Sequence, residues 1–152
     1  MAISSPSEFK LDNPEIDHPP GRVATLVKDH KGITSGVVFK VVGKTKIDEC
    51  IQHLQEREVG NGYEFQLIRV KVENQEIIAL TCIAFEGNEF FLGAARIDRM
   101  AEQISTAKGK AGPNHEYVLK LAENIRALFP DEDEPHLFGL ERRVRDFLRI
   151  AA

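Results

Sequence analysis

The hydrophobic pattern of this chain changes its period at residues 60–62 (GNG), and this change constrains the fold most strongly. Before it, apolar side chains in residues 47–54 recur at helical spacing, which predicts one face of a helix. After it, residues 63–72 follow a period of two, and residues 77–85 return as a partner strand after a short turn at residues 73–75, which predicts a β-hairpin. The chain must therefore combine helices with antiparallel strands.

The segments before and after residues 47–85 also predict both strands and helices. Residues 22–27 and the β-branched run 37–42 predict two earlier strands, the second of them buried on both faces. Pro113 is predicted to be the first residue of a later helix. The last third predicts three helices with these apolar stripes: Ile97, Met100, Ala101 and Ile104; Tyr117, Leu121, Ile125 and Leu128; and Leu137, Leu140, Val144 and Phe147 or Leu148.

Strands followed by helices indicate an α+β fold, with a mixed, mostly antiparallel sheet or a partial barrel and with helices in the C-terminal third. The 152 residues are a suitable length for one domain with a hydrophobic core. Residues 1–20 are polar and rich in proline, which predicts a flexible N-terminal extension. Residues 21–152 are predicted to form the domain.

Composition narrows the possible partners. The net charge of −4 and the isoelectric point near 5.8 argue against a nucleic-acid-binding protein. Cys50 and Cys82 lie in apolar segments and are typical of reduced core thiols. The five histidines lack metal-ligand spacing, and the helix face of Glu49, His53 and Glu56 is more typical of a solvated surface, so no metal or cofactor is predicted. No apolar run is long enough to span a membrane, and the expected location is the cytoplasm.

Glu58 departs from its local pattern. It follows Leu54 on the helical stripe, at a position where the pattern predicts an apolar core residue. A buried carboxylate needs a partner or a raised pKa, and the turn that follows would place Glu58 at a helix end. Two interpretations remain open: a general base, or a helix that frays before Glu58 and leaves its side chain in water. Tyr117 is likewise either a core residue with a satisfied hydroxyl or part of a pocket wall.

Several short segments, in the same order along the chain, resemble motifs of the ChaC-type, glutathione-specific γ-glutamylcyclotransferases. They are GRVATLV at residues 21–27, GVVF at 36–39, RE and GY at 57–58 and 62–63, FLG at 91–93, AEQI at 101–104, GPNHEY at 112–117 and HLFGLE at 136–141. Each match is short, but their shared order is specific. The resemblance implies a γ-glutamylcyclotransferase-like fold for residues 21–152.

The resemblance also implies a reaction and a site. In the family, the glutamate of the corresponding RE motif is the catalytic base, and here that residue is Glu58. It would take a proton from the α-amino group of glutathione, and the amine would attack its own γ-carbonyl to give 5-oxoproline and Cys-Gly. By the same resemblance Tyr117, Tyr63 and Gly93 would bind the substrate, and the reaction needs no metal or cofactor.

Two departures from the family pattern leave other hypotheses open. The family's YGSL loop, whose backbone amides hold the γ-glutamyl group, has no counterpart in this sequence, and RE is followed by VGNG rather than KGG. The alternative is a catalytically inactive or truncated family member that serves as a binding or interaction module. A third hypothesis is cyclisation or transfer on another γ-glutamyl amine.

Overall fold

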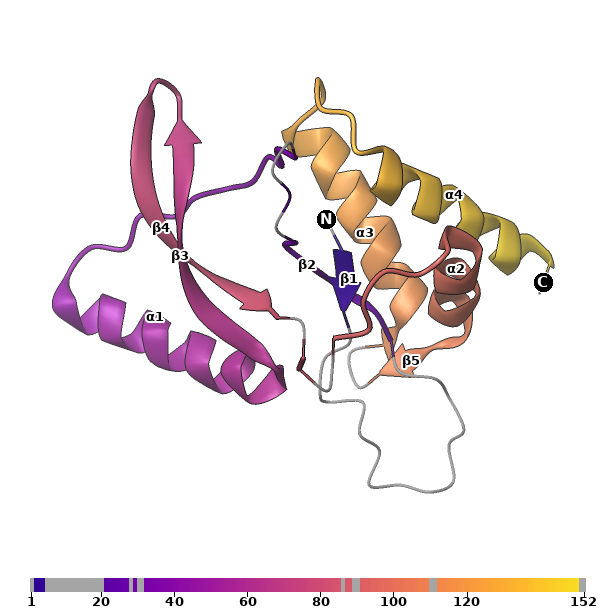
Figure 1. Cartoon of the computed structure of the whole chain (residues 1–152), viewed down its shortest axis with the longest axis horizontal. Coiled ribbons are helices and arrows are strands. Elements are labelled where there is room, and N and C mark those ends of the chain that lie inside the picture. Colours follow the sequence, from indigo (N-terminus) through magenta and orange to yellow (C-terminus); the bar gives the residue numbers. More distant parts are fainter. Residues whose placement is uncertain are drawn as a thin grey trace.

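The computed structural model describes residues 2–4, 21–27, 29, 32–85, 87–88, 91–109 and 112–150. Within these ranges the strands pair as three antiparallel two-stranded ladders, β1–β2, β3–β4 and β5–β6 (Figure 1). The predicted α+β class is confirmed. In chain order the elements are β1 (Ala2–Ser4), β2 (Val23–Thr25), α1 (Lys44–Arg57), the 3-10 turn η2 (Val59–Asn61), β3 (Tyr63–Val72), β4 (Gln75–Ala84), α2 (Ile97–Thr106), β5 (Lys108–Gly109), β6 (Gly112–Pro113), α3 (Asn114–Leu128) and α4 (Pro135–Ile150).

Helices α2, α3 and α4 pack together and enclose the main hydrophobic core (Figure 1). The predicted faces of α2 and α4 are confirmed, because each apolar stripe turns toward the other helices. Their buried apolar side chains are Met100, Ala101 and Ile104 on α2, and Leu137, Leu140 and Val144 on α4.

For α3, the predicted first residue and the predicted buried face were both wrong by one position. Pro113 is the N-cap and the helix begins at Asn114. Its buried residues are Asn114, Val118 and Ala122, whereas the predicted stripe is only partly buried and Leu128 is exposed. Small side chains on this face bring α3 close to α2 and α4, and Tyr117 therefore lies beside the core rather than at its centre.

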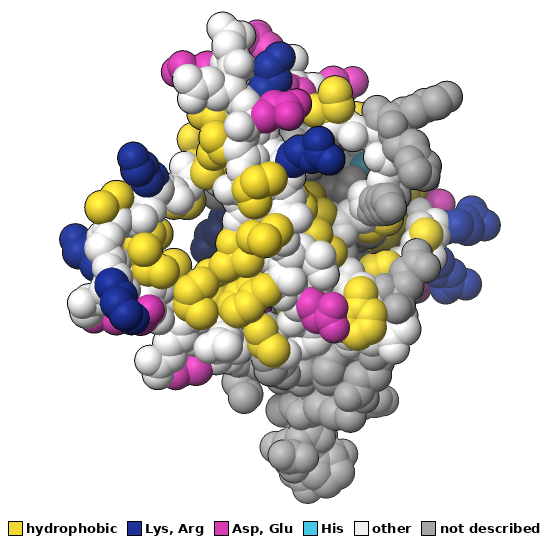
Figure 2. All heavy atoms as spheres, turned by 60° about the vertical axis from the view of Figure 1, so that its left-hand side comes forward, with side chains coloured by type: hydrophobic (Ala, Val, Ile, Leu, Met, Phe, Trp, Pro, Cys, Tyr) yellow, Lys and Arg dark blue, Asp and Glu magenta, His cyan; other side chains and the backbone are white. Residues whose placement is uncertain are grey.

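The predicted hairpin is confirmed. Strand β3 pairs with β4 along its whole length, from Tyr63 opposite Ala84 to Val72 opposite Gln75. The hairpin and α1 lie on one side of the molecule, and α2, α3 and α4 lie on the other (Figure 1). Figure 2 turns the side of the hairpin and α1 toward the reader and shows hydrophobic side chains gathered on that face.

Helix α1 confirms the predicted helix but not its predicted burial. The structure describes all of α1, and none of its residues is buried. Ile47 is exposed, and Cys50, Ile51 and Leu54 are partly buried. The helix lies at the edge of the molecule (Figure 1), where solvent reaches most of its surface.

The predicted strand at residues 37–42 is wrong. The segment forms no strand, and its large apolar side chains are exposed, with Phe39 at 84%. A β-branched run becomes a strand only when a neighbour completes its hydrogen-bond ladder. In the described part of the chain, no strand pairs with this run.

The N-terminal strand β1 lies in the segment predicted to be a flexible extension. Ala2–Ser4 pair antiparallel with Val23–Thr25 of β2. Residues 5–20 lie outside the described residues, and the boundary between residues 20 and 21 stays a prediction. Among the described helices, none combines the length and apolar character needed to cross a membrane.

Candidate active site

A cavity of about 390 Å³ lies where β2, the C-terminal end of α1, the hairpin and α3 meet. Its walls come from segments that are far apart in the sequence. The lining residues are Val23 and Ala24 of β2, Leu54 and Arg57 of α1, Glu58, Tyr63 of β3, Leu80, Thr81 and Cys82 of β4, and Tyr117 of α3. Glu58, Tyr63 and Tyr117, which the resemblance assigns to one site, therefore share one cavity.

Glu58 is the C-cap of α1, as the sequence pattern predicts. Its backbone N–H donates to the carbonyl of Leu54 at 2.9 Å, and its own carbonyl accepts the N–H of Tyr63 at 3.1 Å. The turn at residues 59–62 therefore fixes the start of β3 against the end of α1. The side chain of Glu58 is 23% exposed, so it lines the cavity and does not extend freely into water.

Arg57 lies directly beside this carboxylate. Its Nε is 3.0 Å from Oε1 of Glu58, and its side chain is 69% exposed. In the sequence, Arg57 stands out only as part of the RE motif, because a basic residue in the last turn of a helix is common, and its contact with Glu58 is visible only in the structure. The contact places a positive and a negative group together in the cavity wall.

Tyr117 reaches the cavity from the first turns of α3. Its hydroxyl oxygen accepts the backbone N–H of Ala24 at 3.1 Å, which leaves the phenolic proton for another acceptor. Burial raises the pKa of Tyr117; the Ala24 N–H opposes this rise, and the nearby Tyr63 and Glu58 add to it. A tyrosine is already protonated at neutral pH, and the raised pKa of Tyr117 moves its ionisation still further from neutrality, so Tyr117 is both a cavity wall and a hydrogen-bond donor.

Strand β2 is held against α3 by the side chain of Asn114. The backbone N–H of Arg22 donates to Asn114 Oδ1 at 2.7 Å, and Asn114 Nδ2 donates to the carbonyl of Arg22 at 2.9 Å. Arg22 Nε also donates to Gln103 Oε1 at 2.7 Å, which connects the strand to α2. The sequence analysis missed this role of Asn114, whose position at the start of a helix is also typical of a simple cap.

The opposite side of β2 is linked to the hairpin. Thr25 Oγ1 accepts the backbone N–H of Ala84 at 2.9 Å, and Thr25 is only 4% exposed. Ala84 lies opposite Tyr63 in the β3–β4 ladder. One short strand therefore joins the two walls of the cavity.

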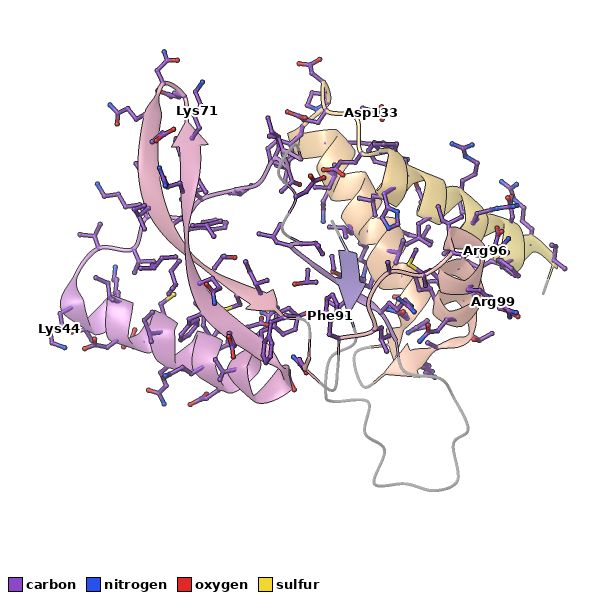
Figure 3. All side chains as sticks on the ribbon, viewed as in Figure 1. Lys44, Lys71, Phe91, Arg96, Arg99 and Asp133 are labelled. Carbon is purple, nitrogen blue, oxygen red and sulfur yellow. The ribbon has the colours of Figure 1, made fainter. Side chains whose placement is uncertain are left out.

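Three further residues belong to the description of this region: Gly93, Phe91 and Cys82. Gly93 adopts a left-handed backbone (φ +64°), which favours glycine, but it does not line the cavity. Phe91, two residues earlier, lies in the connection between the hairpin and α2 (Figure 3).

Cys82 lines the cavity, and burial together with the charge of Glu58 raises the pKa of its thiol. Across the described residues, no three His, Cys, Asp or Glu side chains are arranged to hold a metal ion.

Comparisons with known proteins connect this geometry to one family. The sequence model of the family described as ChaC-like protein matches residues 11–147. The glutathione-specific γ-glutamylcyclotransferase 1 of Danio rerio is 40% identical over 137 residues, which cover 88% of this chain and 69% of the relative. The human protein of the same name is 34% identical over 136 residues, which cover 87% of this chain and 61% of the relative.

A more distant relative and a solved structure agree with these matches. The glutathione-specific γ-glutamylcyclotransferase of Schizosaccharomyces pombe is 32% identical over 117 residues, which cover 72% of this chain and 56% of the relative. A crystal structure of a yeast γ-glutamyl cyclotransferase specific to glutathione superposes with a TM-score of 0.71. It covers 95% of this chain and 83% of its own, and at 23% identity it supports the fold alone.

Proposed function

The chain belongs to the ChaC-like protein family, and we propose that it is a γ-glutamylcyclotransferase that converts glutathione into 5-oxoproline and Cys-Gly. The observation that carries the proposal is the shared cavity of Glu58, Tyr63 and Tyr117. The relatives described above are named as glutathione-specific enzymes, and this gives the alternative of an inactive binding module no support.

In this mechanism Glu58 is the general base. It takes a proton from the α-amino group, and the nitrogen attacks the γ-carbonyl carbon of the same molecule. A new C–N bond closes the five-membered ring, the γ-amide C–N bond breaks, and the proton returns to the departing amine of Cys-Gly. No water is consumed, and proximity within one substrate supplies much of the rate acceleration.

The other cavity residues orient the substrate. Tyr117 is protonated at neutral pH, burial raises its pKa further, and it offers a hydrogen bond to the substrate. Tyr63 is held beside Glu58 by the backbone hydrogen bond between the two residues. Gly93 lies outside the cavity lining, and its predicted role in substrate binding stays a prediction. We expect the protein to act in the cytoplasm, where the thiols of Cys50 and Cys82 would stay reduced.

The test is release of 5-oxoproline from glutathione by the purified chain. Because a general base contributes about 10²- to 10⁴-fold, Glu58→Gln should lower kcat by that factor. Glu56→Gln is the matched control, since Glu56 is an exposed carboxylate on the same helix and contacts Gln52. γ-Glutamyl dipeptides assayed in parallel measure the preference for glutathione. A folded wild-type chain that releases no 5-oxoproline would refute the proposal and favour the inactive module.

A further inference from the structure

Among the described residues of the cavity wall, the charged side chains form one adjacent pair. Among the described residues that line the cavity, the side chains other than those of Arg57 and Glu58 are uncharged. Arg57 Nε and Glu58 Oε1 are 3.0 Å apart, and the guanidinium is largely exposed while the carboxylate is largely covered. A ligand that enters this cavity therefore meets a positive and a negative group side by side.

The proposed substrate carries two charged groups that are complementary to Arg57 and Glu58. The γ-glutamyl group has an ammonium and a carboxylate on the same α-carbon. We propose that Arg57 binds the α-carboxylate of the substrate while Glu58 receives the α-ammonium, an inference that rests on the proposed function. On binding, the two ends of the protein ion pair exchange partners: Arg57 leaves Glu58 for the substrate carboxylate, and Glu58 accepts the substrate ammonium.

Geometry selects the α-carboxylate over the glycine carboxylate of glutathione. A general base must lie within hydrogen-bond reach, about 2.6–3.2 Å, of the proton that it removes. The α-carboxylate is attached to the same carbon as that amine, so it must lie close to Glu58, where Arg57 already is. The glycine carboxylate is at the other end of the tripeptide. The planar guanidinium also offers two parallel donors to a carboxylate, which an ammonium does not.

The proposal assigns Arg57 a role in substrate recognition and orientation. Exchange of ion-pair partners leaves no charge of the cavity unpaired in the complex. It also fixes the amine next to Glu58 before the proton is transferred. The position of Arg57 at the end of a helix would by itself suggest only an interaction with the helix dipole.

The experiment compares Arg57→Gln and Arg57→Lys with wild type, and Arg99→Gln serves as the control. Arg99 is an exposed arginine that pairs with Glu102 on α2, on the opposite side of the molecule from α1 (Figure 3). Hydrogen bonds to charged groups contribute about 1.5–3 kcal/mol, so Arg57→Gln should raise the KM for glutathione about 10- to 100-fold with a smaller change in kcat. Arg57→Lys, which keeps the charge but loses the fork, should give an intermediate KM, and Arg99→Gln should match wild type.

A second set of measurements identifies the carboxylate. The probe is 4-aminobutyryl-Cys-Gly, which keeps the amine and the γ-amide but lacks the α-carboxylate, and its inhibition constant is measured against glutathione turnover. We expect it to bind wild type more weakly than glutathione does, and to bind Arg57→Gln as well as it binds wild type. Glutathione with its glycine carboxylate converted to an amide should still lose affinity in Arg57→Gln.

Three results would overturn the inference. An unchanged KM in Arg57→Gln would remove Arg57 from binding, and so would an equal loss of affinity for the probe. A loss that disappears with the glycine amide would assign Arg57 to the other carboxylate. If wild type releases no 5-oxoproline at all, both the proposed function and this inference are refuted. If wild type is active and the substitutions of Arg57 leave the KM unchanged, the inference alone is refuted.

Discussion

The side chain of Asn114 satisfies both backbone polar groups of Arg22, and its removal should destabilise the protein strongly. The two hydrogen bonds measure 2.7 and 2.9 Å, and Asn114 is 6% exposed, so neither backbone group has easy access to water. Each buried group left without a partner costs about 1–3 kcal/mol. Asn114→Ala should therefore lower the free energy of unfolding by about 2–6 kcal/mol, out of the 5–15 kcal/mol that is typical of single domains.

The measurement is urea unfolding followed by far-ultraviolet circular dichroism, with the free energy extrapolated linearly to water. Ser105→Ala is the matched control, because the half-buried Ser105 donates its hydroxyl to the Glu102 carbonyl at 2.8 Å in an exposed hydrogen bond within α2. We expect it to change stability by less than about 0.5 kcal/mol. Asn114→Asp keeps the acceptor for the Arg22 N–H but places a carboxylate oxygen against the Arg22 carbonyl, so it should not restore the stability of wild type. A loss below about 1 kcal/mol for Asn114→Ala, with an unchanged m-value, would show that the Asn114–Arg22 contact does not hold β2.

Two further predictions concern stability: the first tests the hydrogen bond that joins the two cavity walls, and the second tests an ion pair of the helical core. Thr25→Val leaves the buried N–H of Ala84 without its acceptor and should cost about 1–3 kcal/mol in urea unfolding, whereas Thr25→Ser, which keeps the hydroxyl, should recover most of that loss. Hydrogen bonds from Arg126, and then from Arg145, hold the pKa of the Glu141 carboxyl below its usual value, so its contribution to stability is present above pH about 4.5 and is lost as the pH falls through the lowered pKa. Glu141→Gln should therefore cost about 1–2 kcal/mol at pH 7, and a difference from wild type that does not shrink toward pH 3 in thermal unfolding would contradict the assignment.

The sequence predicts those elements whose pattern depends on local periodicity. The apolar stripes of α2 and α4, and the two strands and short turn of the β3–β4 hairpin, are signalled within short stretches of sequence, and the structure confirms them. The run at residues 37–42 fails because a strand depends on a neighbour, and sequence composition does not supply one. The buried face of α3 differs from the predicted stripe because Val118 and Ala122 enter the core, whereas Tyr117, for which a core position and a pocket wall had both been left open, lines the cavity.

In the candidate site, too, the residues with a local signal in the sequence could be predicted and the others could not. Glu58 could be found because a carboxylate interrupts an apolar stripe, which is a local signal. Tyr117 of α3 was assigned to the same site only through the family resemblance, and Cys82 of β4 was not assigned to it at all, because no local pattern relates either residue to Glu58. Arg57 is adjacent in sequence and still escaped notice, because exposed arginines at helix ends are common and only the 3.0 Å contact with Glu58 distinguishes it.

Strand β2 connects the stability of the fold to the geometry of the site. On one side it is bound by Asn114 and Tyr117 of α3, and on the other Thr25 binds the backbone of Ala84. The distance between Tyr117 and the Glu58 side of the cavity therefore depends on how this strand is held. Changes that loosen β2 should alter stability and KM together, whereas changes at the largely exposed Arg57 should alter KM with little effect on stability. The two classes of variant separate the residues that build the cavity from those that contact the substrate.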